Sequence, residues 1–244
     1  MRCYCFNQSV DYLPENLTHL TFDDYFNKPV NKLPVSLTHL TLGYCFNQYV
    51  DNLPENLTYL AFGETFNQTV DKLPKNLTHL TFETRFRQSV DNLPKNLTHL
   101  SLYCFYNQSV DYLPETLTHL NSDYQDKQSI EKLPKNLTHL SFNNCDCNLN
   151  NLPENLIYLN LGYTKNNNII IPKNVKKLCI FYENNLINNL PEHIETLVIY
   201  FNSNKNNKII SNLPLTIKEI IINDEKHEKY IKIPFGAILT IKNT

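Results

Sequence analysis

Apolar residues recur along the chain in the pattern L-x-x-L-x-F, whose first copy spans residues 17–22. Within this copy, Leu20 and Phe22 alternate with His19 and Thr21. Alternation of apolar and polar residues with a period of two is typical of a β-strand that buries one face. The pattern therefore predicts a six-residue strand over residues 17–22, with Leu20 and Phe22 directed into the core.

The same pattern returns about every 20 residues, each time after a Leu-Pro or Ile-Pro pair. Twelve of the thirteen prolines hold this position, and only Pro29 does not. A fixed period of this kind indicates a stack of similar structural units. The prolines of the repeat are Pro14, Pro34, Pro54, Pro74, Pro94, Pro114, Pro134, Pro153, Pro172, Pro191, Pro214 and Pro234.

The length of the repeat limits the fold. A strand within 20 residues leaves too little chain for a return helix, and the proline bends the return while removing a ladder donor. One repeat cannot bury its own apolar face, whereas stacked repeats can. We therefore predict a β-rich, leucine-rich-repeat-like solenoid, a right-handed coil of about 12 repeats with one long parallel sheet and little or no α-helix. The repeats should occupy residues 1–222, and residues 223–244 should form a degenerate last repeat and a C-terminal cap.

Two further columns of side chains are expected inside the coil. Aromatic rings aligned between repeats should stack along its axis, and each stacked pair contributes about 1 kcal/mol beyond burial. Both columns lack aromatic rings near Ser122 and Asp126, so we expect the local stability of the stack to be lowest there. The spine residues are Phe6, Phe26, Phe46, Phe66 and Phe86 in one column and Phe22, Phe62, Phe82 and Phe142 in the other.

An asparagine follows the first aromatic column in most repeats. An amide side chain at a bend can bond backbone groups that the bend leaves unpaired. We therefore expect these asparagines to be structural, and we expect Arg87 and Lys127 to interrupt their column. The asparagines are Asn7, Asn27, Asn47, Asn67 and Asn107.

The outward face of the predicted sheet carries a line of rings flanked by threonines, and six of the eight histidines lie in this line. We expect it to form the concave binding face of the solenoid, although it could serve only to stiffen the sheet. The residues are His19, His39, Tyr59, His79, His99, His119, His139 and Tyr158.

The same face does not predict a metal site or an active site. Side chains that point the same way at a spacing of about 4.8 Å do not converge on one tetrahedral centre. Nucleophilic catalysis needs different groups that meet at one point, whereas this line repeats one group. With only four glycines, the chain also lacks a phosphate-binding loop. We therefore expect no enzyme activity, no catalytic residues, no metal and no cofactor.

The composition limits the classes of partner that we expect and the cellular compartment in which we expect the protein. A net charge of -2, with scattered lysine and arginine, argues against nucleic acid as a partner. No apolar run approaches the roughly 18 residues that a membrane helix needs, and no secretory signal is evident. The seven cysteines have no C-x-x-C spacing, so we expect reduced thiols in the cytoplasm.

The best copies of the repeat read F-N-Q-x-V-D-x-L-P-x-N-L-T-H-L-T-F. With these motifs aligned, the sequence resembles the FNIP-repeat (FGxxFN-type) proteins of social amoebae and giant DNA viruses, which are related to leucine-rich-repeat proteins. The resemblance implies a parallel-sheet solenoid, a displaced asparagine, double phenylalanine spines and a role in protein interaction. If the protein is viral, its compartment is the host cytoplasm. Some members carry an F-box and act as ubiquitin-ligase adaptors, but this chain starts inside a repeat at residues 3–7, where we expect no F-box.

Three functions remain open from the sequence. The leading hypothesis is a non-enzymatic solenoid that binds a protein partner through the concave His/Tyr/Thr face. The alternative is a structural or self-assembling repeat protein, and the third is the substrate-recognition part of a ubiquitin-ligase adaptor. Bare terminal repeats invite edge pairing, so we also predict a homodimer formed through a terminal repeat. Because neighbouring imidazoles resist joint protonation, we expect stability or binding to weaken below about pH 6.

Overall fold

The computed structural model describes residues 6–105, 108–123, 132–142, 149, 151–164, 169–183, 187, 189–201 and 208–242. The chain divides into two compact units. The first comprises Met1–Tyr124 with Ile130–Asn136, and the second comprises Gln125–Ser129 with Leu137–Thr244. Each unit is described by itself below.

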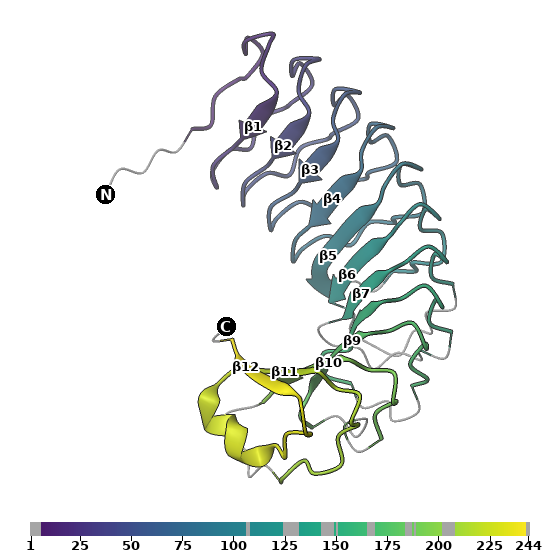
Figure 1. The fold of residues 1–244 in the computed structure, drawn as a ribbon. Helices are drawn as coiled ribbons and strands as arrows, with labels where there is room; N and C mark the ends of the chain where they lie inside the picture. Colours follow the sequence, from purple (N-terminus) through teal and green to yellow (C-terminus); the bar gives the residue numbers. More distant parts are fainter. Residues whose placement is uncertain are drawn as a thin grey trace. The chain divides into compact units, whose positions relative to one another are not determined.

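The described part of the first unit contains six short parallel strands in chain order (Figure 1). Each strand pairs with the next in a register of one repeat, so that His19 lies beside His39 and Leu20 beside Leu40. The strands are β1 (His19–Thr21), β2 (His39–Thr41), β3 (Tyr59–Ala61), β4 (His79–Phe82), β5 (His99–Phe105) and β6 (His119–Asp123).

The second unit continues the same architecture with less regular repeats. Its described strands are also parallel to the neighbours with which they pair. A 3-10 helix, η2 (Glu225–Tyr230), precedes the last strand and packs the buried ring of His227 against Phe201, at 4.6 Å between centroids. The strands are β7 (His139–Phe142), β8 (Tyr158–Asn160), β9 (Lys177–Phe181), β10 (Thr196–Tyr200), β11 (Glu219–Ile222) and β12 (Ile238–Ile241).

These strands confirm the predicted parallel β-solenoid with almost no helix. The six-residue length predicted for each strand is wrong, since most strands have three to five residues. The reason is a turn before each strand, in which Leu17 N donates to Pro14 O at 3.1 Å and Leu37 N donates to Pro34 O at 3.1 Å. The first leucine of the pattern therefore closes a turn and packs inward, and the strand begins after it.

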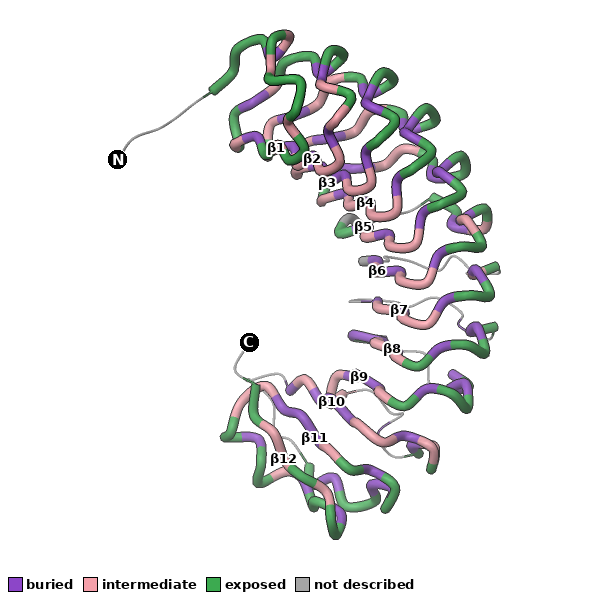
Figure 2. Tube along the Cα trace, turned by 45° about the horizontal axis from the view of Figure 1, so that its top comes forward, coloured by how far each residue is buried: buried purple, intermediate pink, exposed green. Residues whose placement is uncertain are grey.

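Buried residues recur in each successive turn of both units (Figure 2). Leu40 and Leu60 are fully buried, as are the turn leucines Leu37 and Leu57. The aromatic columns lie beside them: Phe26 and its counterparts one repeat away stack at about 6 Å between centroids. Rings of the two columns also meet within a repeat, at 3.7 Å in the pair Phe62 and Phe66.

The asparagine column lies next to this stack and links successive turns. Asn27 N donates to Asn7 Oδ1 at 3.0 Å, and Asn47 N donates to Asn27 Oδ1 at 3.0 Å. The same bond serves Arg87, whose backbone N–H donates to Asn67 Oδ1 at 2.9 Å. Arg87 therefore ends the column without leaving its own amide unpaired, because the acceptor belongs to the preceding repeat. Asn107, Asp126 and Lys127 lie outside the described residues.

Candidate functional site

The line of histidines and tyrosines forms a continuous ring ladder along the strands of the first unit. Each ring belongs to the first residue of its strand, so the one-repeat register places the rings one above another. We call this set the imidazole–phenol ladder. In the first unit it comprises His19, His39, Tyr59, His79, His99 and His119, and in the second it comprises His139 and Tyr158.

Histidine neighbours stack more closely than histidine–tyrosine neighbours. The ring centroids of His19 and His39 are 4.1 Å apart with an interplanar angle of 10°, and the pair His79 and His99 repeats this geometry. Tyr59 interrupts the series, because its centroid lies 5.6 Å from His39 and 6.2 Å from His79. In the second unit, His139 and Tyr158 stack at 5.6 Å.

A threonine before each imidazole determines which ring nitrogen carries the proton. Thr38 Oγ1 lies 3.0 Å from Thr18 O and 2.9 Å from His39 Nδ1. A carbonyl oxygen only accepts, so the single hydroxyl hydrogen of Thr38 goes to Thr18 O. The hydroxyl oxygen must then accept from His39 Nδ1–H, and His39 Nε2 is left unprotonated as an acceptor.

The same relay recurs in the later repeats of the first unit. Thr78 and Thr98 each donate to the carbonyl of the preceding threonine at 3.0 and 3.1 Å, and each lies 2.9 Å from the Nδ1 of its own histidine. Thr118 has the same two contacts, at 3.1 and 2.9 Å. In these repeats the ladder therefore presents a row of Nε2 acceptors on His39, His79, His99 and His119, each in the less usual Nδ1–H tautomer.

Two imidazoles of the ladder, those of His39 and His99, resist protonation. Burial lowers the pKa of His39, and the neighbouring rings of His19 and His79 lower it further. Burial and the imidazoles of His119 and His79 lower the pKa of His99 in the same way. The imidazoles of His39 and His99 therefore favour the uncharged form at neutral pH, and an added proton would both charge the stack and convert an Nε2 acceptor into a donor.

The corresponding face of the second unit differs in a way that the sequence analysis missed. At the positions that carry threonine or serine in the first unit stand Cys179, Val198 and Ile221, which are only 1, 7 and 5% exposed. Tyr158 and Tyr200 pack against them. The signal was present in the strands 177–181, 196–200 and 219–222, where apolar runs replace the alternation and indicate burial on both faces.

A small cavity of about 150 Å³ lies over this apolar patch, with Tyr158, Lys177 and Tyr200 among its lining residues. The Cys179 thiol donates to Tyr158 Oη at 3.5 Å, and Lys177 Nζ lies 5.7 Å from the centre of the Tyr158 ring. Burial raises the pKa of the Cys179 thiol and that of the Tyr158 hydroxyl. Both groups therefore stay protonated, and the thiol is a poor nucleophile.

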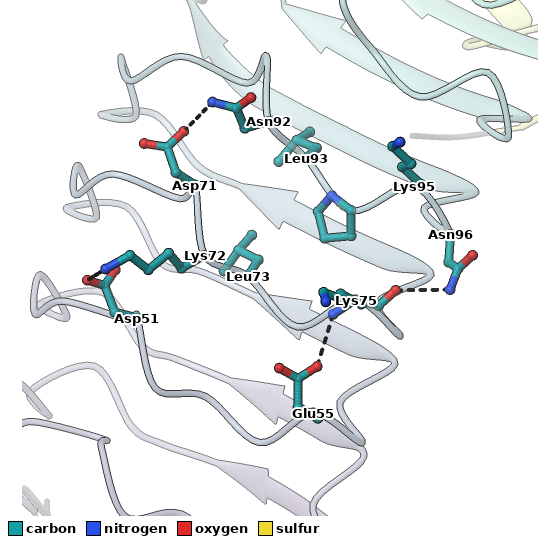
Figure 3. Close-up of a pocket in the computed structure, with 11 residues that line it drawn as sticks. Asp51, Glu55, Asp71, Lys72, Leu73, Lys75, Asn92, Leu93, Lys95 and Asn96 are labelled. Atoms are coloured by element: carbon teal, nitrogen blue, oxygen red, sulfur yellow. Dashed lines mark hydrogen bonds and ion pairs between the residues drawn. The ribbon is translucent and has the colours of Figure 1, made fainter.

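A larger groove of about 730 Å³ lies on the turn side of the first unit (Figure 3). Its polar groups pair with one another between successive repeats. Lys72 Nζ lies 3.2 Å from Asp51 Oδ2, and Asn92 Nδ2 donates to Asp71 Oδ1 at 3.0 Å. These contacts connect neighbouring turns. The polar side chains of the groove therefore have a structural role that requires no ligand.

Within the described ranges, no three or more His, Cys, Asp or Glu side chains are arranged to hold a metal ion. In the same part of the chain, no helix has the length and apolar character needed to cross a bilayer.

Comparisons with known proteins agree with this architecture. The family model described as "FNIP Repeat" matches residues 6–45, 29–64, 46–83 and 66–105. The chain is similar to CroV588, a circular leucine-rich-repeat protein of a giant virus, at 29% identity and a TM-score of 0.66 over 97% of this chain. It shares the fold of YopM from Yersinia enterocolitica, at 17% identity and a TM-score of 0.57 over 95% of this chain. The chain spans 45% of the length of CroV588 and 65% of that of YopM. No curated protein sequence matches it.

Proposed function

This chain is an FNIP-repeat protein with a leucine-rich-repeat-like fold, and from that premise we propose that it is a non-enzymatic protein that binds a protein partner through the imidazole–phenol ladder. Solenoids of the leucine-rich-repeat type typically serve as scaffolds for protein interaction. The free thiols of Cys45 and Cys179 suit a reducing compartment, so we place this interaction in the cytoplasm, or in the host cytoplasm if the protein is viral.

The row of Nε2 acceptors carries this proposal. An uncharged acceptor binds groups that donate hydrogen bonds, such as the amides of Asn and Gln, the hydroxyls of Ser and Thr, and the cationic ends of Lys and Arg. A carboxylate offers only acceptors at neutral pH and would find no donor at the Nε2 atoms of the imidazoles. The ladder therefore fits a partner surface rich in hydrogen-bond donors and disfavours an acidic one.

A capture experiment tests the role of the ladder. The protein with both His79→Ala and His99→Ala should lose a partner that the unchanged protein retains from a cell lysate. The matched control carries Lys75→Ala and Lys95→Ala, two exposed positions in the same repeats on the turn side. Equal retention by the two double variants would show that the ladder does not bind the partner.

The proton position can be measured without a partner. Long-range ¹H–¹⁵N spectra at pH 7.5 should show hydrogen on Nδ1 of His39, His79 and His99. Thr78→Val should release His79 alone to the common Nε2–H tautomer, because it removes the accepting hydroxyl. Hydrogen on Nε2 in the unchanged protein would refute the acceptor row while leaving other modes of binding through this face open.

A second candidate function is self-assembly, and the exposed ends of the stack favour it. Phe6 at one end and Ile241 at the other are 44 and 40% exposed, although both belong to core columns. Since the chain spans slightly less than half of the circular protein CroV588, two copies joined end to end would have nearly the length of that protein.

A further inference from the structure

We propose that two copies of this chain associate head to tail, with β12 of one copy adding in parallel to β1 of the other in the register that the repeats use within a chain. This proposal specifies the self-assembly considered above and does not depend on what the ladder binds. Three observations support it. The first is the exposure of apolar side chains at both edges, the second is the set of hydrogen-bonding groups with which each later repeat binds the one before it, and the third is the pair of opposite charges that the register brings together.

The edge at β1 exposes side chains that are buried in every described repeat behind it. Phe6 is 44% exposed, whereas Phe26 in the same column is fully buried. Leu20 is half-buried, whereas Leu40 is fully buried. Among the described residues, no strand pairs with β1 on the side away from β2. The end therefore presents an open core and a row of unpaired backbone groups.

The edge at β12 is open in the opposite direction. Ile241 is 40% exposed, whereas Ile222, its partner on β11, is fully buried. In the described part of the chain, β12 pairs with β11 alone. A second copy of β1 would cover Leu239 and Ile241 as β12 covers Ile220 and Ile222 of β11.

Among the described residues, no repeat precedes the first one to provide a carbonyl for its asparagine side chain. In later repeats, Asn56 Nδ2 donates to Val35 O at 2.8 Å, and Asn76, Asn96 and Asn136 donate to the corresponding carbonyls at 2.8 to 3.0 Å. Asn16 holds this place in the first repeat and is exposed. In a head-to-tail contact the acceptor would be the carbonyl of Phe235, which follows Pro234 as Val35 follows Pro34.

In the part of the chain that the structure describes, the backbone at the start of β1 likewise has no acceptor from a preceding repeat. Thr38 N, His39 N and Thr38 Oγ1 all donate to Thr18 O, at 2.9 to 3.0 Å. The equivalent groups of Thr18 and His19 would find the carbonyl of Ala237, the residue before β12. The contact would thus reproduce the hydrogen bonds that already join successive repeats within the chain.

The register also pairs opposite charges. Since Ile220 lies beside Leu239 and Ile222 beside Ile241, continuing the sheet places Leu239 against Leu20 and Ile241 against Phe22 of the next copy. Lys242 then stands opposite Asp23. A symmetric contact between two β1 edges would be antiparallel and would lose all of these pairings, so the interface joins unlike edges.

Disulfide trapping tests the register. Thr240→Cys and Thr21→Cys fall side by side in the proposed contact, at a spacing of about 4.8 Å that a disulfide can bridge. Mixing the two single variants under mild oxidation should give a cross-linked pair with one copy of each. The control mixes Thr240→Cys with His19→Cys, two residues out of register, and should give little cross-link. No cross-link in the first mixture, or equal cross-link in both, would overturn the proposal.

Light scattering tests the association without engineered thiols. The unchanged protein should have a mass above that of one chain at high micromolar concentration. Ile241→Ser should shift association to concentrations at least about tenfold higher, since tenfold corresponds to only 1.4 kcal/mol. Ile170→Ser makes the same change at an exposed residue, at 75% exposure, away from either edge and should leave the mass unchanged. A single-chain mass for the unchanged protein at every concentration would refute the association.

Discussion

At the scale of the residue, one hydroxyl group determines the chemistry of the candidate site. Thr38 gives its only hydrogen to the carbonyl of Thr18, so its oxygen accepts from His39 Nδ1. Without the threonine, an exposed imidazole would favour no particular partner. The T-H pair of the repeat therefore specifies an acceptor row, and the sequence alone shows the pair without showing the proton.

Ser122 is a residue-scale departure from the repeat. It stands in the column of Phe22, Phe62 and Phe82, is 3% exposed, and its Oγ has no hydrogen-bond partner in the described structure. A buried hydroxyl without a partner costs about 1–3 kcal/mol. The predicted weakening of the stack near this position remains a prediction, since Tyr124 and Asp126 lie outside the described residues.

We predict that Ser122→Ala raises the free energy of unfolding by about 1 kcal/mol, because it removes the unpaired hydroxyl and keeps the volume nearly constant. Urea denaturation followed by circular dichroism measures the change. Ser101→Ala, at a half-buried position where Asn121 Nδ2 donates to the hydroxyl at 3.4 Å, should give no gain. A loss of stability in Ser122→Ala would show that the hydroxyl has a partner in the folded protein.

At the scale of the element, the phenylalanine stack and the ladder depend on neighbours in adjacent repeats. Phe66 contacts Phe62 at 3.7 Å and has Phe46 and Phe86 at 6.2 Å on its two sides. Phe6 has only Phe26, at 6.0 Å, on one side. The same residue type at the same repeat position therefore contributes differently according to its place in the stack.

We predict that Phe66→Ala lowers the free energy of unfolding by about 3–5 kcal/mol, the usual cost of removing a buried ring. Phe6→Ala should cost less than half as much because Phe6 is already 44% exposed. Denaturation at a low protein concentration keeps the terminal contact from contributing. Equal losses for the two variants would contradict an end effect within the stack.

The ladder makes stability depend on pH. The pKa values of His39 and His99 are lowered in the folded protein, so on acidification the unfolded chain takes up protons first. Stability should therefore be fully present above about pH 6.5, the ordinary histidine value, and should fall as the pH drops below it. The melting temperature should be lower at pH 5.5 than at pH 7.5, and by a smaller margin in the variant with His39→Gln and His99→Gln. The same melting temperature at both pH values would refute this dependence.

At the scale of the whole molecule, the two units present different outer faces. The first carries the ring ladder with threonines, and the second carries the buried patch of Cys179, Val198 and Ile221. The recognition of donor groups that we propose therefore rests mainly on the first unit, which holds six of the eight ladder rings. Self-association, by contrast, uses one edge from each unit, so blocking either edge should leave partner binding by the ladder intact.

The sequence by itself determined the parallel solenoid and the order and register of its strands. It did so because each repeat contacts only its neighbours, so a 20-residue period specifies the contacts of every repeat at once. The ring columns and the asparagine column follow from the same period, and the structure shows their described members in stacked positions.

Only the tertiary structure decided the features that depend on groups from different turns. The strands are shorter than the sequence pattern because the first leucine donates its backbone N–H to the proline carbonyl and so belongs to a turn. The backbone N–H of Arg87 donates to an acceptor of the preceding repeat. The histidine tautomer depends on a carbonyl one repeat away, and the exposure of Phe6 and Ile241 depends on how many neighbours each repeat has. A one-dimensional pattern contains neither the direction of a hydrogen bond nor the position of an open edge.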